Sequence, residues 1–221
     1  MSPNVERFCM NFNILLALYL LVGMFHLIFI LTESKNGRQF TKILLMPLLI
    51  LWAYSTQPLF LLLLALCWGW AGDVLLLRKE RRIFLKLGLF AFLLGHISYI
   101  SLFLLHSGSY PAVGVFSVAI CLYAFFGWGM FLTLRAGLGR MALPVGIYIF
   151  VISLMSVSAF LFAMSSGGTA WWAFAGSLLF VFSDSALALQ LFRKPFKYGR
   201  FVVMASYIPA QFLLAFGILF L

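Results

Sequence analysis

The chain has 221 residues, of which 65% are hydrophobic and only 9% are charged, and its formal net charge is +10. Soluble domains average about 45–50% apolar and about 25% charged residues, and a chain of this length could not bury so much apolar surface in water. The composition therefore excludes a soluble globular protein and predicts a single transmembrane domain over residues 1–221.

Eight apolar runs follow one another along the chain, and each is expected to form a transmembrane helix. About 20 mostly apolar residues are needed to cross the hydrocarbon core, and the breaks between the runs carry turn residues such as Ser, Gly and Pro. The sequence thus predicts an all-α integral membrane protein, a bundle of about eight transmembrane helices. The second run is short and contains Pro47, which predicts a kinked or tilted helix. The runs are residues 12–31, 41–54, 59–77, 84–105, 112–134, 142–164, 170–192 and 201–221.

The basic residues alternate with these runs in a way that predicts the topology. Of the fifteen Lys and Arg, all but Arg7 lie at the breaks after the first, third, fifth and seventh runs. The positive-inside rule then places these breaks in the cytoplasm and both termini outside. The charge is explained without a nucleic-acid partner, and no protein partner is inferred. The bare outer breaks favour a bacterial inner membrane.

A short internal similarity raises the possibility of two parallel four-helix halves. Residues 72–76 (Gly-Asp-Val-Leu-Leu) resemble residues 183–187 (Ser-Asp-Ser-Ala-Leu), and residues 96–100 correspond in the same way to residues 206–208. Halves with an even number of spans would be related by an axis along the membrane normal. Chance similarity between leucine-rich helices is the alternative interpretation.

Asp73 and Asp184 are the only acidic residues within the apolar runs. An aspartate at the centre of a membrane helix costs about 2.5–3.5 kcal/mol, so such residues usually face a cavity and serve a function. Measured from the basic residues that follow them, the two lie roughly 8 Å and 14 Å below the cytoplasmic boundary. Both are expected in the cytoplasmic half, where they could share one pocket. Two close carboxylates cannot both ionise readily, which suits one acid and one base.

Structural roles are the alternative for each polar residue in the runs. Either aspartate could pin a neighbouring helix, for example by pairing with Lys42, which is expected at the start of the second helix. Lys42 could equally be an interfacial anchor or hold a lipid phosphate. Four further residues could line the same cavity as hydrogen-bond partners, or could join helices. They are His96, Tyr99, Tyr207 and Gln211.

Patterns for metals, cofactors and nucleophilic catalysis are weak or missing. Cys9, Cys67 and Cys121 form no CxxC pair, and the three histidines lack a metal-binding spacing. The chain also contains no GxSxG nucleophile motif and no phosphate-binding loop with a lysine. No disulfide, metal or cofactor is predicted.

Five motifs in order resemble the YhhN-like lysoplasmalogenase family, over almost the whole chain from Thr41 to Gln211. The sequence departs from the family at Ile43, where a proline is common after Thr-Lys. Because Pro47 remains, this departure puts little in doubt. The motifs are Thr-Lys-Ile-Leu-Leu-Met-Pro at 41–47, Gly-Asp-Val-Leu-Leu at 72–76, Gly-Leu at 88–89 with Phe-Leu-Leu-Gly-His-Ile-Ser-Tyr at 92–99, Phe-Ser-Asp at 182–184 with Leu-Ala at 187–188, and Ser-Tyr-Ile-Pro-Ala-Gln at 206–211.

The resemblance implies a membrane hydrolase that cleaves the vinyl ether bond of a lysoplasmalogen entering from the bilayer. The products would be a fatty aldehyde and a glycerophospho-ethanolamine or glycerophospho-choline, and the family's functional aspartates fall on Asp73 and Asp184. Asp184, the deeper of the two, is the better candidate for the acid. Two other classes stay open: a small proton-coupled transporter that uses the aspartates as a relay, and an assembly protein in which they pin helices.

Overall fold

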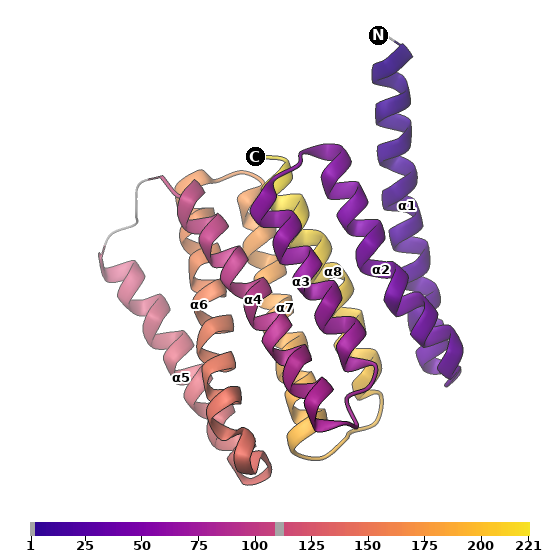
Figure 1. The fold of residues 1–221 in the computed structure, drawn as a ribbon. Helices are drawn as coiled ribbons and strands as arrows, with labels where there is room; N and C mark the ends of the chain where they lie inside the picture. Colours follow the sequence, from indigo (N-terminus) through magenta and orange to yellow (C-terminus); the bar gives the residue numbers. More distant parts are fainter. Residues whose placement is uncertain (1–2, 109–112) are drawn as a thin grey trace. The chain divides into compact units, whose positions relative to one another are not determined.

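The computed structural model describes residues 3–108 and 113–221, and within these ranges the chain is all-helical, as predicted, with eight α-helices, one short 3₁₀-helix and no strand (Figure 1). The expected turn residue Ser109 and the first residue of the expected fifth helix, Ala112, lie outside the described residues, as do the side chains of Arg7 and Cys9. The helices are α1 (Pro3–Leu31), α2 (Lys35–Thr56), α3 (Phe60–Leu76), α4 (Arg82–His106), α5 (Val113–Leu138), η1 (Gly139–Met141), α6 (Ala142–Ser166), α7 (Ala170–Phe192) and α8 (Gly199–Leu219).

By length and composition, five segments of the described chain can cross a membrane, which makes this a multi-pass membrane protein. One of them, Gly114–Ser166, is 53 residues long and contains both α5 and α6, because only the short η1 separates these helices. The 17 residues of α3 fall short of the usual length of about 20, and α2 begins with a charged turn. The other four segments are Ile14–Leu31, Arg82–His106, Ala170–Phe192 and Gly199–Leu219.

The start of the second helix differs from the prediction. It was expected at residue 41, but α2 begins at Lys35, so Lys42 lies two turns inside the helix and does not open it. The apolar run marks only the part of a helix that hydrocarbon would cover. Polar residues with long side chains, such as Lys35 and Gln39, also favour the helix and can extend it into the interface.

The chain divides into two compact units, with the boundary inside α4. Unit 1, Met1–Ser98, contains α1, α2, α3 and most of α4, and α2 packs against both α1 and α3. Unit 2, Tyr99–Leu221, contains the end of α4 and the helices α5 to α8, which pack in chain order. Each unit is therefore described by itself, and the single transmembrane domain stays a prediction.

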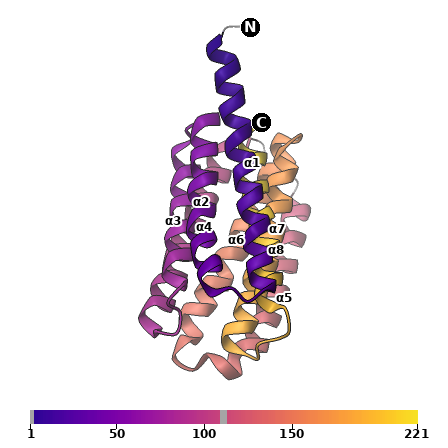
Figure 2. The same ribbon diagram turned by 90° about the vertical axis from the view of Figure 1, so that its right-hand side faces the viewer.

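Small residues bring the backbones of α7 and α8 together in unit 2. A Cβ atom on Gly176 would lie 2.7 Å from the backbone nitrogen of Leu214, and one on Gly217 would lie 2.3 Å from that of Ala173. Such close approaches are typical of helix packing in membranes, where dispersion contacts replace the hydrophobic driving force. Figures 1 and 2 both draw the two helices side by side. The pair forms a rigid support for Asp184, which lies on α7.

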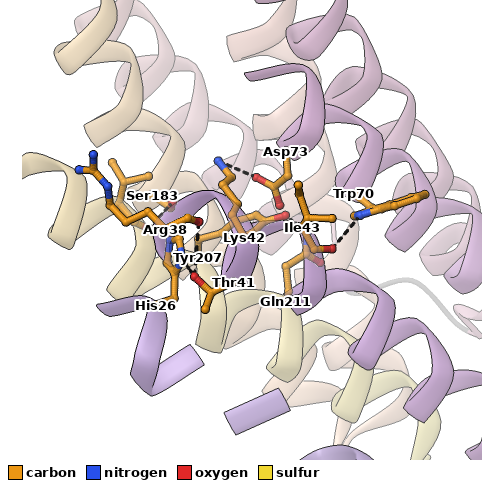
Figure 3. Close-up of polar contacts among 11 residues, drawn as sticks. His26, Arg38, Thr41, Lys42, Ile43, Trp70, Asp73, Ser183, Tyr207 and Gln211 are labelled. Atoms are coloured by element: carbon orange, nitrogen blue, oxygen red, sulfur yellow. Dashed lines mark hydrogen bonds and ion pairs between the residues drawn. The ribbon is translucent and has the colours of Figure 1, made fainter. Parts of the chain in front are cut away.

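In unit 1, a tryptophan completes the helix around Pro47. Proline has no N–H, so the carbonyl of Ile43, four residues earlier, loses its usual helical partner. The indole Nε1 of Trp70 on α3 donates to this carbonyl at 3.0 Å (Figure 3). Because the freed backbone group is satisfied from a neighbouring helix, α2 continues through the proline to Thr56. The same bond holds α2 against α3 beside Lys42.

Candidate active site

Asp73 lies in the last turn of α3 and forms an ion pair with Lys42 of α2. The Lys42 Nζ is 3.0 Å from Asp73 Oδ1, and the two side chains are 19% and 5% exposed (Figure 3). A buried charge without a partner is strongly unfavourable, so each residue makes the other tolerable in this position. The contact matches the geometry expected if Asp73 pinned a helix. It also leaves Lys42 partly exposed, with two of its three N–H donors available to a ligand or to other groups.

The neighbouring contacts fix the turn of α2 that carries Lys42. The Thr41 hydroxyl donates to the carbonyl of Gly37 at 2.7 Å and lies 2.7 Å from Nδ1 of His26 on α1. On the other side, Trp70 binds the carbonyl of Ile43. Figure 3 shows Thr41, Lys42 and Ile43 in succession, with contacts to α1 and α3. Lys42 is therefore held in place by hydrogen bonds from both of its chain neighbours.

Asp184 lies in the middle of α7 and accepts a hydrogen bond from the hydroxyl of Tyr148 on α6. The preceding residue, Ser183, is fully buried and donates to the backbone carbonyl of Val203 on α8 at 2.9 Å. Together with the close α7–α8 packing, this fixes the rotation of α7. The carboxyl group of Asp184 is thus directed toward α6, where its partner is a phenol.

Tyr148 is the residue of this site that sequence reasoning missed. It lies within an apolar run and belongs to none of the five motifs. The available signal was chemical, because a tyrosine hydroxyl at membrane depth must find a hydrogen-bond partner. The partner itself lies 36 residues away on another helix, so helical spacing could not identify it.

Three of the four predicted cavity residues form one hydrogen-bonded chain in unit 2. The Tyr99 hydroxyl donates to Oε1 of Gln211 at 3.0 Å, and Nε2 of Gln211 donates to the hydroxyl of Tyr207 at 3.2 Å. All three side chains are buried. The Tyr207 ring also packs edge-on against Phe180, one turn before Asp184 on α7, with ring centroids 5.4 Å apart. The hydrogen bonds join these three residues to one another, whereas a shared cavity with the aspartates and a role in substrate binding stay predictions.

His96, the fourth of these residues, is fully buried on α4 and belongs to unit 1. It precedes Tyr99 by three residues on the same helix, and this spacing places both on one face of α4. Among the residues that the structure describes, no group of three His, Cys, Asp or Glu side chains is placed to hold a metal ion.

Each unit therefore contains one of the two aspartates, and their carboxyl groups lie in different settings. Asp73 faces an ammonium group, while Asp184 receives a hydrogen bond from a neutral phenol. Two carboxyl groups in unlike environments can divide acid and base work between them.

Comparison with known proteins places the chain in a family. The sequence pattern of the YhhN family matches residues 37–218. The chain belongs to the YhhN family. This confirms the resemblance drawn from the five motifs, and the matched YhhN segment contains Lys42, both aspartates and Tyr148.

Part of the chain is also similar to a protein whose name describes an activity. It is 37% identical over 82 residues to the Bos taurus protein named lysoplasmalogenase TMEM86A. The aligned part covers 35% of this chain and only 34% of the length of the bovine protein. No solved structure matches the chain.

Proposed function

We propose that this YhhN family member is a membrane hydrolase that cleaves the vinyl ether bond of a lysoplasmalogen or a related ether lysolipid. The observation that carries the proposal is the family match over residues 37–218, which includes every candidate site residue. The name of the bovine relative supports the same chemistry. The substrate enters from the bilayer, and the products are a fatty aldehyde and a glycerophospho-ethanolamine or glycerophospho-choline.

The proposed reaction needs one proton donor, one negative charge and water. Protonation of the vinyl carbon farther from the oxygen leaves an oxocarbenium-like centre on the carbon bonded to it. A carboxylate stabilises this positive charge and takes a proton from the water that attacks. The resulting hemiacetal breaks its bond to the glycerol oxygen, which leaves as a hydroxyl group, and the aldehyde is released. The balance is one vinyl ether and one water giving one alcohol and one aldehyde, and protein side chains alone can supply these proton transfers.

The environments of the two aspartates support a division of roles. Asp73 lies beside the Lys42 ammonium and is the candidate for the carboxylate that stabilises the cation. Asp184 accepts a hydrogen bond from a phenol, which stabilises a carboxylate less than the ammonium beside Asp73 does, and this difference supports Asp184 as the acid of the two. Tyr148 binds one of its oxygens and so directs the other, and we assign it as a positioning residue.

The remaining predicted residues are proposed to bind or orient the substrate. Lys42 keeps two N–H donors beyond its bond to Asp73 and can hold the lipid phosphate. The hydrogen-bonded chain of Tyr99, Gln211 and Tyr207 can fix a water molecule or a hydroxyl group of the lipid. His96 is proposed to act with them from α4.

The proposed topology has eight spans, with both termini outside and the chemistry in the cytoplasmic half of a bacterial inner membrane. Its support is that the connections after α1, α3, α5 and α7 carry or border nearly all of the basic residues. Two observations are compatible with a membrane-spanning role of α2 and α3. Helix α3 is apolar, and the carbonyl that Pro47 frees in α2 is hydrogen-bonded by Trp70. Cysteine accessibility from either side of the membrane, at Ser34 and at Ser165, would test the assignment.

Aldehyde release from a lysoplasmalogen by the purified, detergent-solubilised chain tests the function. The parent chain is expected to release aldehyde, whereas Asp73→Asn and Asp184→Asn are expected to be folded and inactive. Ser158→Ala serves as a matched control, because among the described residues this buried hydroxyl bonds back to the carbonyl of Leu154 in its own helix. Aldehyde release by a folded Asp184→Asn variant would contradict the proposed mechanism. A folded parent that releases no aldehyde, yet exchanges a labelled solute across liposomes, would favour transport.

A further inference from the structure

A long apolar groove lies between α5 and α6 in unit 2. Its volume of about 570 Å³ falls in the range of roughly 300–1,000 Å³ that is typical of ligand pockets. Along α5 it extends from Phe116 to Phe131, about 22 Å at 1.5 Å per residue, whereas the hydrocarbon of one leaflet is about 15 Å thick. The groove is therefore long enough for a whole lipid chain.

The shape of the groove suits a single chain that enters from the side. The rim side chains Trp128 and Phe150 are 64% and 66% exposed. Two glycines, Gly127 and Gly146, line the groove, and at Gly127 the helices pack closely, since a Cβ atom there would lie 3.2 Å from the Ile149 side chain. A Cβ atom on Gly146 would lie 3.5 Å from the Phe131 ring, an ordinary contact, so only a larger side chain at this position would fill the groove.

One hydroxyl group in the wall of the groove lacks a hydrogen-bond partner among the described residues. The Ser153 side chain is 8% exposed, lines the groove, and its Oγ makes no hydrogen bond there. Ser158, five residues later on the same helix, bonds back to its own helix at 2.8 Å, as serines in membrane helices commonly do. An unsatisfied buried hydroxyl costs about 1–3 kcal/mol. The Oγ of Ser153 is covered in the structure, and a rotation of the side chain toward the groove would allow it to bind a ligand oxygen.

A positive charge lies at the cytoplasmic end of the groove as the proposed topology orients it. Arg135 is four residues beyond Phe131 on α5, on the same face, and its side chain is exposed. Side chains of helices lean toward the N-terminus, which directs Arg135 back over the groove. Among the described residues, no carboxylate forms a salt bridge with it. A phosphate group would complement this charge.

The apolar wall, Ser153 and Arg135 follow one another along the groove in the same order as the chain, the glycerol and the phosphate of a lipid. Ser153 packs beside Gly127 in the wall of the groove, where the Cβ position of Gly127 is 3.8 Å from the serine Oγ. Gly127 is eight residues before Arg135, about 12 Å along the helix, a span that the leaning arginine and a glycerophosphate group cover together. Beyond Gly127 the wall toward Phe116 is almost wholly apolar.

We propose that the α5–α6 groove binds a lysophospholipid. The single chain lies along the apolar wall, a glycerol oxygen accepts a hydrogen bond from Ser153, and the phosphate contacts Arg135. A lipid with one chain is proposed in preference to one with two because the groove follows a single pair of helices, α5 and α6. The proposal goes beyond the proposed function, since it needs no vinyl ether. If that function holds, the groove is a binding site for the lysolipid before the reaction, other than the site at which Lys42 is proposed to hold the phosphate.

The test uses the purified full chain and an acyl lysophosphatidylethanolamine that carries a photoactivatable diazirine in its chain. We expect labelling of peptides from α5 and α6 that excess unlabelled lysolipid suppresses. Gly146→Leu should abolish this labelling, and Arg135→Gln should weaken binding about tenfold or more, as expected for the loss of a charge-assisted contact. Labelling that no competitor suppresses, or that spreads evenly over all helices, would mean ordinary surrounding lipid and overturn the proposal.

Matched controls separate binding from folding. Gly129→Leu places the same side chain on α5, at a glycine outside the groove with open space around it. Arg193→Gln removes a charge from the end of α7. Both should bind the probe like the parent. If Gly146→Leu fails to fold, Ser153→Ala replaces it, with an expected loss of about two- to tenfold in affinity, and Ser158→Ala as its control. Unchanged affinity in folded Ser153→Ala and Arg135→Gln would also overturn the proposal.

Because the probe is an ester, its binding is scored independently of vinyl ether cleavage. Saturable labelling of α5 and α6 without aldehyde release from a lysoplasmalogen would refute the proposed function alone. Aldehyde release with labelling confined to other helices would refute the groove alone.

Discussion

The indole nitrogen of Trp70 donates to the carbonyl of Ile43 at 3.0 Å, the carbonyl that Pro47 leaves without a helical partner. Pro47 in α2 frees a backbone carbonyl, and Trp70 in α3 supplies its hydrogen-bond donor. This hydrogen bond holds Lys42, which lies next to Ile43 and pairs with Asp73.

This relationship predicts coupling between Trp70 and Pro47. Trp70→Phe should destabilise the chain by about 1 kcal/mol, because the carbonyl of Ile43 loses its donor. In the Pro47→Ala background the same substitution should cost less, since the N–H of residue 47 can then bind that carbonyl. Thermal unfolding of the four variants in detergent measures this cycle. Equal losses in both backgrounds would mean that the indole bond is not the partner of the freed carbonyl.

The Lys42–Asp73 pair allows stability to be separated from catalysis. Lys42→Met or Asp73→Leu alone should destabilise the chain by about 3 kcal/mol, because each breaks the ion pair and leaves one charge in a buried or half-buried position. The double variant should recover much of this stability and still release no aldehyde. A stable double variant with parental activity would show that Asp73 only pins α2 to α3.

Tyr148 is expected to act on the reaction through Asp184. Tyr148→Phe removes the hydrogen bond to the carboxyl group and should lower kcat by about tenfold or more while changing KM little, since the lost contact positions a group for the chemical step. Stability should fall by only about 1 kcal/mol. Steady-state kinetics on a lysoplasmalogen measures the split. Tyr54→Phe, at an exposed tyrosine of α2, is the control. A rise in KM at constant kcat would argue instead for substrate binding.

Alanine substitutions should have opposite effects on stability at two glycines, one inside the close contact of α7 and α8 and one outside it. Gly176→Ala should destabilise the chain by about 1–3 kcal/mol, because its Cβ would lie 2.8 Å from the carbonyl oxygen of Ala210 and force the helices apart. Gly129→Ala on α5 has open space around it and should be neutral or stabilising by up to about 1 kcal/mol, as helix propensity predicts. Unfolding midpoints in the same detergent compare them. A neutral Gly176→Ala would mean that α7 and α8 can separate without loss.

The sequence alone determined the class of the protein and gave two candidate functional groups, Asp73 and Asp184. Apolar runs reveal membrane helices because hydrocarbon accepts almost no unpaired polar group. For the same reason, two aspartates within such runs are candidates for function. The motifs around them identified the family, which the match over residues 37–218 confirmed. The predicted start of the second helix was wrong. Hydropathy marks where the hydrocarbon would begin, and α2 extends beyond this point to Lys35.

The tertiary structure decided which group faces which. The pairing of Tyr148 with Asp184 joins residues 36 positions apart, and the bond of Trp70 to Ile43 joins residues 27 positions apart. Spacing along one helix identifies only neighbours three or four residues away. Partners on different helices depend on how each helix is rotated about its axis, and close backbone contacts such as that at Gly176 set this rotation. Composition determines that these helices enter a membrane, whereas packing determines which side chains they bring together.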